Sequence, residues 1–121
     1  MSTQLTLTAG ERGGFPALRA AGPLDSATHT VLDEQLAAIR ARKPRALILD
    51  LAGVDYISSA GARVILAAHR ALKAAGGALA LIHLQPPVRI VFEVIMALPI
   101  LNVFDDPAEL DRYLERLSRA P

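Results

Sequence analysis

Residues 46–61, with the sequence ALILDLAGVDYISSAG, carry the strongest indication of fold in this chain. The continuous apolar run 46–49 predicts a strand that lies centrally in a sheet or is covered on both faces, and Asp50-Leu51 closes it. A loop of small and polar residues, 52–58, follows. Beyond it, apolar residues recur at helical spacing on one predicted helix face: Val64, Ile65, Ala68, Leu72 and Ala75. A buried strand that leads directly into an amphipathic helix predicts an α/β fold.

The segment before this stretch predicts a hairpin and a first helix. Leu5 and Leu7 alternate with polar residues, as in a half-buried edge strand, and a turn at Gly13-Gly14 precedes a second strand at 15–20. Gly22-Pro23 then breaks the second strand. The helix that follows is expected to have Asp25 or Ser26 as its cap, an apolar face of Leu32, Leu36 and Ile39, and Pro44 as its stop.

The segment after the second helix, which ends at Gly76-Gly77, predicts two further strands and two further helices. Residues 78–82 form a buried strand, and a third helix opens at Pro86-Pro87 and ends at Pro99. Its inward-facing residues are predicted to be Val88, Val91, Phe92, Ile95 and Met96. A short strand at 100–103 then precedes a terminal helix, marked by Asp106, Pro107 and Glu109 and by apolar Leu110, Leu114 and Leu117.

Strands that alternate with helices imply right-handed crossovers and a largely parallel sheet. We therefore expect an α/β fold with a five-stranded, mostly parallel mixed sheet, an N-terminal hairpin that makes one edge antiparallel, and four helices. The 121 residues fit a single domain, 1–121, and an apolar content of 52% suits a packed core.

Composition narrows the classes of partner and of chemistry. Thirteen basic and twelve acidic residues give a net charge of +1, so we expect no nucleic-acid partner. The absence of cysteine excludes disulfides and thiolate chemistry. Residues 1–4 lack the pattern of a secretory signal, and no apolar run in the sequence has the length of a membrane span, so a cytoplasmic protein is expected.

The chemistry of interest lies at Ser58 and Ser59, two hydroxyls at the predicted start of the second helix. Unpaired amides and the helix dipole favour negative charge there by about 0.3 to 1 kcal/mol. A phosphate would add roughly −1.5 to −2 charge units and would repel a docked partner. A serine before a helix is also an ordinary N-cap, and both readings stay open from the residues alone.

The residues 50–61, DLAGVDYISSAG, resemble the signature of STAS domains, in which a serine pair followed by glycine opens a helix. The resemblance extends to Gly22-Pro23-Leu24-Asp25, to Ala75-Gly76-Gly77 and to Val88-Arg89 with Val91-Phe92-Glu93, and so covers nearly the whole chain. The chain departs from the family pattern at Ser58, where the family has aspartate, at Ala60, where serine is frequent, and at Ala62, where leucine is usual.

The resemblance implies an anti-sigma factor antagonist, a phosphoprotein that regulates transcription by partner switching. Its phosphorylation site would be Ser59, with Ser58 as the second choice, and its partner-binding residues would be Asp25, Ser58, Ser59, Ala60, Gly61 and Arg63. The implied partners are an anti-sigma factor serine kinase, bound in the unphosphorylated state, and a serine phosphatase. The chain itself would be a monomer or weak dimer with no enzymatic activity, cofactor or metal.

Two alternatives remain from the sequence. The departures at Ser58, Ala60 and Ala62 also suit a STAS subunit without phosphorylation, in a lipid transporter or a stress-signalling complex. An enzyme or small-ligand protein with an anion site before the second helix has little support, because no phosphate-binding loop or nucleophile elbow is present. Solvent or packing roles are expected for His29, His69 and His83, and structural roles for Asp50 and Asp55. A core role is expected for the stripe Val91, Phe92, Ile95 and Met96.

Overall fold

The computed structural model describes residues 4–119, which contain five strands and four helices. In chain order the elements are β1 (Thr6–Arg12), β2 (Phe15–Ala21), α1 (His29–Arg40), β3 (Leu47–Gly53), α2 (Ser59–Ala74), β4 (Leu79–Ile82), α3 (Pro86–Val94), β5 (Asn102–Phe104) and α4 (Pro107–Arg119). Every predicted element is therefore present. No helix in this part of the chain has the length and apolar character needed to cross a bilayer.

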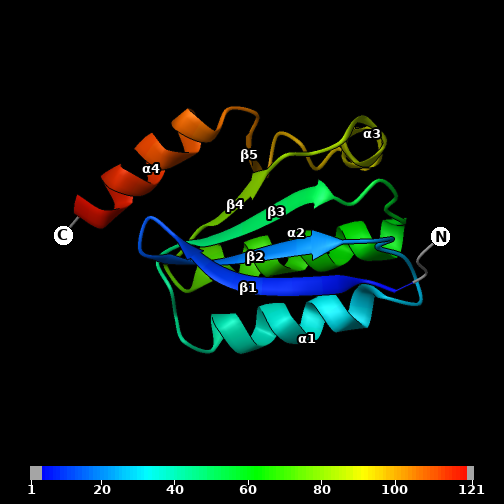
Figure 1. The fold of residues 1–121 in the computed structure, drawn as a ribbon, viewed down its shortest axis with the longest axis horizontal. Coiled ribbons are helices and arrows are strands. Elements are labelled where there is room, and N and C mark those ends of the chain that lie inside the picture. The colour runs from blue at the N-terminus through cyan, green and yellow to red at the C-terminus, as the bar shows by residue number, and fades with distance from the viewer. Residues whose placement is uncertain (1–3, 120–121) are drawn as a thin grey trace.

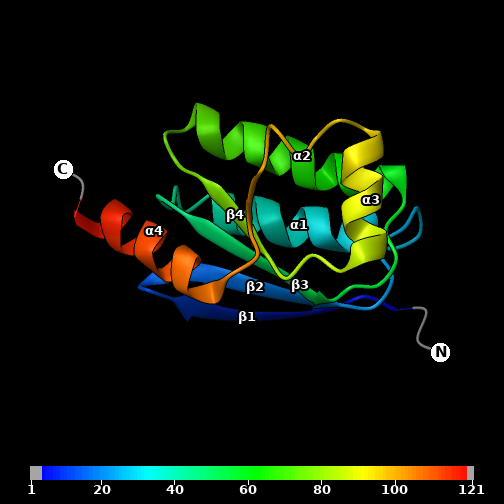
Figure 2. The same cartoon turned by 90° about the horizontal axis from the view of Figure 1, so that it is seen from above.

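The strands form one sheet in the order β1-β2-β3-β4-β5 (Figure 1). The β1–β2 hairpin is antiparallel, whereas β2, β3, β4 and β5 pair in parallel. This arrangement confirms the predicted mixed sheet with an antiparallel edge. It also brings the loop after β3, which leads into α2, to the end of the sheet where the parallel strands finish (Figure 2).

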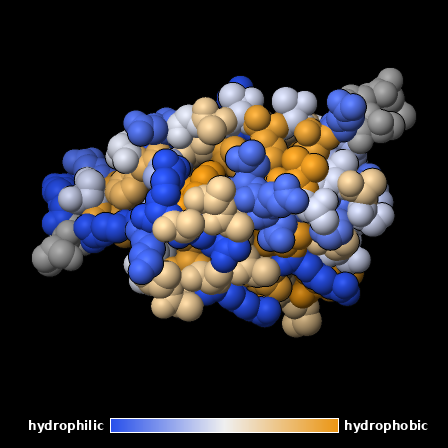
Figure 3. Space-filling model, turned by 90° about the horizontal axis from the view of Figure 1, so that it is seen from below, coloured by the Kyte–Doolittle hydropathy of each residue, from blue (hydrophilic) through white to orange (hydrophobic). Residues whose placement is uncertain are grey.

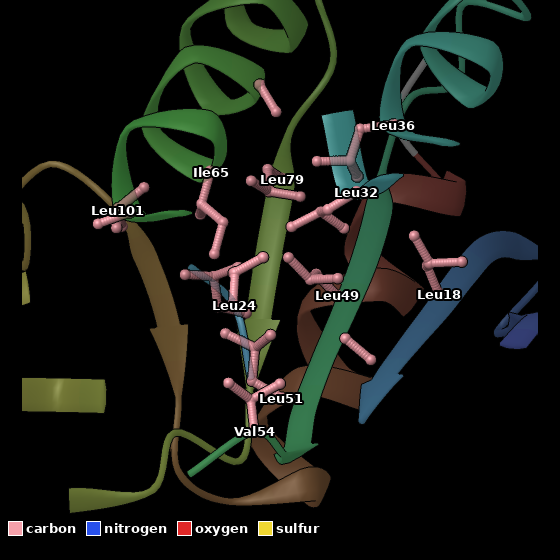
Figure 4. Close-up of a cluster of buried hydrophobic side chains, with 14 of the residues drawn as sticks. Leu18, Leu24, Leu32, Leu36, Leu49, Leu51, Val54, Ile65, Leu79 and Leu101 are labelled. Atoms are coloured by element: carbon pink, nitrogen blue, oxygen red, sulfur yellow. The ribbon is translucent and has the colours of Figure 1, made fainter. Parts of the chain in front are cut away.

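Alternation along β3 divides the buried residues between the two faces of the sheet. Leu47, Leu49 and Leu51 pack with the α1 and α2 side, where Leu32, Leu36 and Ile65 are fully buried (Figure 4). The intervening Ile48 lies on the opposite face in a smaller cluster with Leu110 and Leu114 of α4. A strand buried on both faces reads as a continuous apolar run, which is why residues 46–49 predicted β3 correctly.

Apart from β5, which spans Asn102–Phe104 where a strand at 100–103 was expected, three element boundaries differ from the sequence-based expectation, the first of them at the end of β3. This strand continues past Asp50-Leu51 to Gly53, because β2 extends to Ala21 and pairs with Gly53 there. A Cβ at Gly53 would lie 2.7 Å from the Ala21 Cβ, so glycine permits this close pairing. Regular α1 begins at His29, after a turn at 26–28.

The third difference concerns α3, which ends at Val94 and not at Pro99. The Met96 amide donates to the Glu93 carbonyl at 3.0 Å and the Ala97 amide to the Phe92 carbonyl at 2.8 Å, which terminates the helix as a Schellman motif. Met96 adopts the left-handed backbone conformation, with φ of 58°, and is 76% exposed. The prediction that Met96 faces the core was therefore wrong.

Fewer of the predicted apolar residues of α2 and α3 are buried than the sequence pattern indicates. Ala75 lies beyond the end of α2 and is exposed, and Val64 is only half-buried. His69 takes a buried position that the sequence pattern did not assign to it. In α3, Val88 and Phe92 are buried, whereas Val91 and the following Ile95 are half-buried.

Candidate functional site

Two turns that are distant in sequence lie side by side at the start of α2. Leu24 forms an isolated parallel bridge with Ile57. The Leu24 amide donates to the Tyr56 carbonyl at 3.0 Å, and the Ser58 amide donates to the Leu24 carbonyl at 2.9 Å. These bonds hold the turn that contains Asp25 next to the serine pair.

Ser58 is the N-cap of α2. Its backbone is extended, with φ of −91° and ψ of 170°, and its Oγ accepts a hydrogen bond from the Gly61 amide at 3.3 Å. Its carbonyl accepts the first helical bond, from Ala62, at 3.0 Å. The half-buried Ser58 hydroxyl is therefore engaged in holding the helix start, as the capping interpretation predicts.

Ser59 is the first residue of α2 and is exposed. Within residues 4–119 its hydroxyl has no hydrogen-bond partner, and the amides of Ser59 and Ala60 also have none. An exposed hydroxyl therefore lies beside two unpaired N–H groups at the positive end of a helix dipole. Such an environment tolerates added negative charge.

The remaining residues of the turn differ in exposure. Gly61 is buried, and a Cβ there would lie 2.7 Å from both Cγ and the carbonyl oxygen of Leu24. Glycine thus allows the first turn of α2 to approach the Leu24 segment. Ala60 is half-buried, and Arg63 is exposed one helical turn after Ser59.

Asp25 has a defined structural role in its own turn. Its Oδ1 accepts hydrogen bonds from the amides of Ala27 at 2.9 Å and Thr28 at 3.1 Å. The Thr28 hydroxyl accepts in return from the Asp25 amide at 2.9 Å and donates to the Pro23 carbonyl at 2.8 Å. This reciprocal pair is a capping box that starts the turn before α1. Sequence reasoning identified Asp25 but missed the buried Thr28, three residues later.

A second polar cluster joins the middle of β3 to the chain just after β4. Asp50 accepts from the Ala52 amide at 2.9 Å, and its carboxylate lies 3.2 Å from Nδ1 of His83 and 3.6 Å from Nε of Arg19. The Gln85 side chain donates to the Ala52 carbonyl at 2.6 Å. These contacts tie the segment after β4 to β3, which is a structural role for Asp50, as predicted.

The three histidines do not come together. His29 is half-buried, His69 is 5% exposed and His83 is exposed. Burial, followed by the charges of Lys73 and Arg70, lowers the pKa of His69 below its usual value of 6.5. Across residues 4–119, no three His, Cys, Asp or Glu side chains are grouped so that they could hold a metal ion.

The fold and this turn define a small α/β domain that exposes a serine where a central strand passes into a helix. The STAS domain family model matches residues 6–110 of the chain. This chain belongs to the STAS domain family.

Individual proteins resemble the chain to different extents. A candidate anti-sigma factor antagonist, BtrV, of Bordetella bronchiseptica is 44% identical over 73 residues, which cover 60% of this chain and 63% of that relative's length. The crystal structure of an anti-sigma factor antagonist from Mycobacterium paratuberculosis superposes with a TM-score of 0.82 at 19% identity, covering 92% of this chain and 94% of that one. The phosphorylated form of Bacillus SpoIIAA has a TM-score of 0.68 at 18% identity, with 89% and 99% covered.

Proposed function

We propose that this protein is an anti-sigma factor antagonist whose binding to an anti-sigma factor kinase is switched off by phosphorylation of Ser59. The observation that carries the proposal is the difference in hydrogen bonding and exposure between the two serine hydroxyls. Ser58 uses its hydroxyl as the helix cap, whereas the Ser59 hydroxyl is exposed and unbonded. The STAS family match and the name of the Bordetella relative support the choice of partner.

The switch follows from electrostatics at the helix start. In the unphosphorylated state, the surface around Ser59 contains the half-buried Asp25 and Ala60 and the exposed Arg63, and is open to a docking protein. A phosphate on Ser59 adds roughly −1.5 to −2 charge units, which unpaired helix amides stabilise. The domain keeps its fold while the docked partner meets a charged, strongly hydrated group. A serine phosphatase then restores the binding state.

The first test is phosphorylation itself. The protein is incubated with the anti-sigma factor kinases of its own organism and ATP, and the mass of the intact chain is measured for wild type, Ser59→Ala and Ser58→Ala. We expect one phosphate on wild type and on Ser58→Ala, and none on Ser59→Ala. Ser26→Ala is the matched control, because Ser26 is exposed in the neighbouring turn.

Two outcomes contradict this proposal in different ways. A phosphate that persists on Ser59→Ala and disappears from Ser58→Ala moves the acceptor to Ser58. If no kinase modifies or binds the wild-type chain, the phosphorylation switch is wrong, and an unphosphorylated STAS subunit of a larger complex becomes the better description.

The second test measures the effect of charge on partner binding. Ser59→Asp is expected to weaken binding to the kinase at least tenfold, because the carboxylate places negative charge on the docking surface. Ser59→Asn is the neutral control of similar size and is expected to bind much more tightly than Ser59→Asp. Isothermal titration calorimetry gives both affinities. Equal affinity of the kinase for the two variants would contradict the electrostatic mechanism.

A further inference from the structure

Five of the thirteen basic residues of this protein lie together at the end of the molecule opposite to Ser59. Residues 35–49 contain four basic and no acidic residues, and residues 56–92 also contain four basic and no acidic residues. Five of these cations belong to the C-terminal parts of α1 and α2 and to the loop after α1. We name them the basic end: Arg40, Arg42, Lys43, Arg70 and Lys73.

Backbone contacts join the two segments that supply the basic end. The Ala78 amide, just after α2, donates to the Arg45 carbonyl at 3.1 Å, and the Leu47 amide donates to the Ala78 carbonyl at 2.9 Å. Gly77 packs so closely on the Pro44 carbonyl that a Cβ would lie 2.6 Å from it. The C-terminal ends of α1 and α2 therefore meet at one end of the molecule, as Figures 1 and 2 show.

Four of the five side chains of the basic end are exposed, and none of the five forms an ion pair in the described part of the chain. Arg42, Lys43, Arg70 and Lys73 are exposed, and Arg40 is half-buried. The ion pairs found in residues 4–119 use other cations, for example Arg12 with Asp111 and Arg119 with Glu115. Glu11 lines a shallow recess with Arg42 but forms no ion pair with it. Figure 3 views the molecule from the side of α1, and hydrophilic residues are dense toward its left-hand end, where α4 also lies (Figure 1).

The favourable interaction of cations with the C-terminal end of a helix explains only some of the five residues of the basic end. Arg40 and Lys73 lie in the last turns of α1 and α2, where cations stabilise the helix end. Arg42 and Lys43 follow the end of α1, and Lys43 has a left-handed backbone with φ of 52°. Arg70 precedes the last turn of α2. Interaction with a helix end therefore does not account for these three cations.

We infer that the basic end binds the surface of a membrane that contains anionic phospholipids. Clusters of four to eight Lys and Arg residues are typical of such binding. Single-stranded nucleic acid fits less well, because none of the five aromatic residues belongs to the basic end, where stacked bases would need one. Ile100, which is 46% exposed and lines one recess with Lys73, adds an apolar side chain beside the cations.

Binding in this orientation is compatible with the switch. The Ser59 turn lies beyond the carboxyl ends of the parallel strands, whereas the basic end lies at their amino ends (Figure 1). A protein held on a membrane by the basic end would thus keep the Ser59 surface open to its partner. The inference does not depend on phosphorylation and survives if the proposed function fails.

The test is co-sedimentation of the full chain with vesicles at low salt. Vesicles of phosphatidylcholine mixed with phosphatidylglycerol are expected to bind the protein, and vesicles of phosphatidylcholine alone are not. Lys43→Gln and Arg70→Gln are each expected to lower the partition coefficient about fivefold, since each removes one surface cation. Arg63→Gln, at the opposite end, is the matched control and is expected to bind like wild type.

Three outcomes would overturn the inference. The first is equal binding to both kinds of vesicle. The second is an equal loss in Arg63→Gln and in the two variants of the basic end, which would indicate a non-specific effect of net charge. The third is tighter binding to a DNA duplex or to a polyglutamate peptide at the same salt concentration, which would assign the surface to another class of partner. Circular dichroism of each variant excludes loss of fold as the cause.

Discussion

At the scale of single residues, the two adjacent serines have different environments although they are the same residue type. Ser58 precedes the helix with an extended backbone, so its Oγ reaches the Gly61 amide. Ser59 already has helical geometry, and its exposed hydroxyl makes no such bond within residues 4–119. Residue type alone named both positions as candidates and the family resemblance favoured Ser59, whereas the physical difference between them depends on the backbone at which the helix begins.

This difference predicts unequal effects of alanine on stability. Ser58→Ala removes a helix cap and is expected to lower the free energy of unfolding by about 1 kcal/mol. Ser59→Ala removes an exposed hydroxyl that bonds to nothing and is expected to change it by less than about 0.5 kcal/mol. Urea denaturation followed by circular dichroism measures both values. A larger loss for Ser59→Ala would show that the cap has been assigned to the wrong serine.

His69 predicts a dependence of stability on pH. Its pKa in the folded protein is lowered from 6.5, mainly by burial, so the unfolded chain binds a proton more readily than the folded one. The neutral ring contributes its full stability above the unfolded pKa. That contribution is lost as the pH falls below about 6.5 and through the folded pKa.

The measurement compares wild type with His69→Gln, which cannot titrate. The free energy of unfolding of wild type relative to this variant is expected to decrease between about pH 8 and about pH 5.5. Other titrating groups, which are common to both proteins, cancel in the difference. A difference that stays constant over this range, or an NMR titration that gives His69 a pKa above 6.5, would contradict the prediction.

At the scale of elements, helix ends were the least predictable features. The sequence pattern extends α3 to Pro99, yet the helix stops at Val94 through the hydrogen bonds of Met96 and Ala97. Met96 occupies the position where glycine is favoured, so no local residue signals the end. Apolar spacing likewise placed Met96 in the core, because a helical pattern cannot show that the helix has already ended.

Replacement of Met96 by glycine is expected to stabilise the protein. A left-handed conformation costs a non-glycine residue roughly 1 to 2 kcal/mol, and the greater freedom of glycine in the unfolded chain returns about 0.4 to 1 kcal/mol of that. Met96→Gly should therefore raise the free energy of unfolding by about 0.5 to 1 kcal/mol. Met96→Ala is the control that removes the side chain and keeps the strain. If Met96→Ala stabilises as much, relief of backbone strain is not the cause.

At the scale of the whole molecule, the sheet lies between two apolar clusters. The strands β3 and β4 contribute buried residues to both of them. Leu49 is buried on the α1 and α2 side, whereas Leu114 of α4 is buried on the other. Leu49→Ala and Leu114→Ala are each expected to lower the free energy of unfolding by about 2 to 5 kcal/mol. Because both clusters share the same strands, each variant should unfold in one transition with an unchanged denaturant slope.

Denaturant unfolding followed both by tyrosine fluorescence and by far-ultraviolet circular dichroism checks this prediction. Tyr113 packs on Phe104 next to the α4 cluster, with ring centroids 5.2 Å apart, and reports on that side when Tyr56, the second tyrosine, is replaced by Phe in all proteins compared. The two signals should change together in wild type and in both variants. Separate transitions in Leu114→Ala would show that α4 detaches from the sheet before the remaining structure unfolds.

The sequence by itself determined the order and type of the elements, the hairpin and the serine-bearing turn. These features depend on apolar spacing and on Gly and Pro at element ends, which act over a few residues. For example, Gly13-Gly14 sets the hairpin turn wherever the rest of the chain lies. The same local reasoning found the candidate serines and Asp25.

Only the tertiary structure decided how these parts come together. The bridge between Leu24 and Ile57 sets Asp25 beside the serines, and the start of α2 leaves Ser59, and not Ser58, with a free hydroxyl. The net charge of +1 gives no indication that Arg42, Lys43 and Arg70 lie together at one end of the molecule. Contacts between distant segments depend on the packing of the whole chain around its sheet, and neither spacing nor composition contains that information.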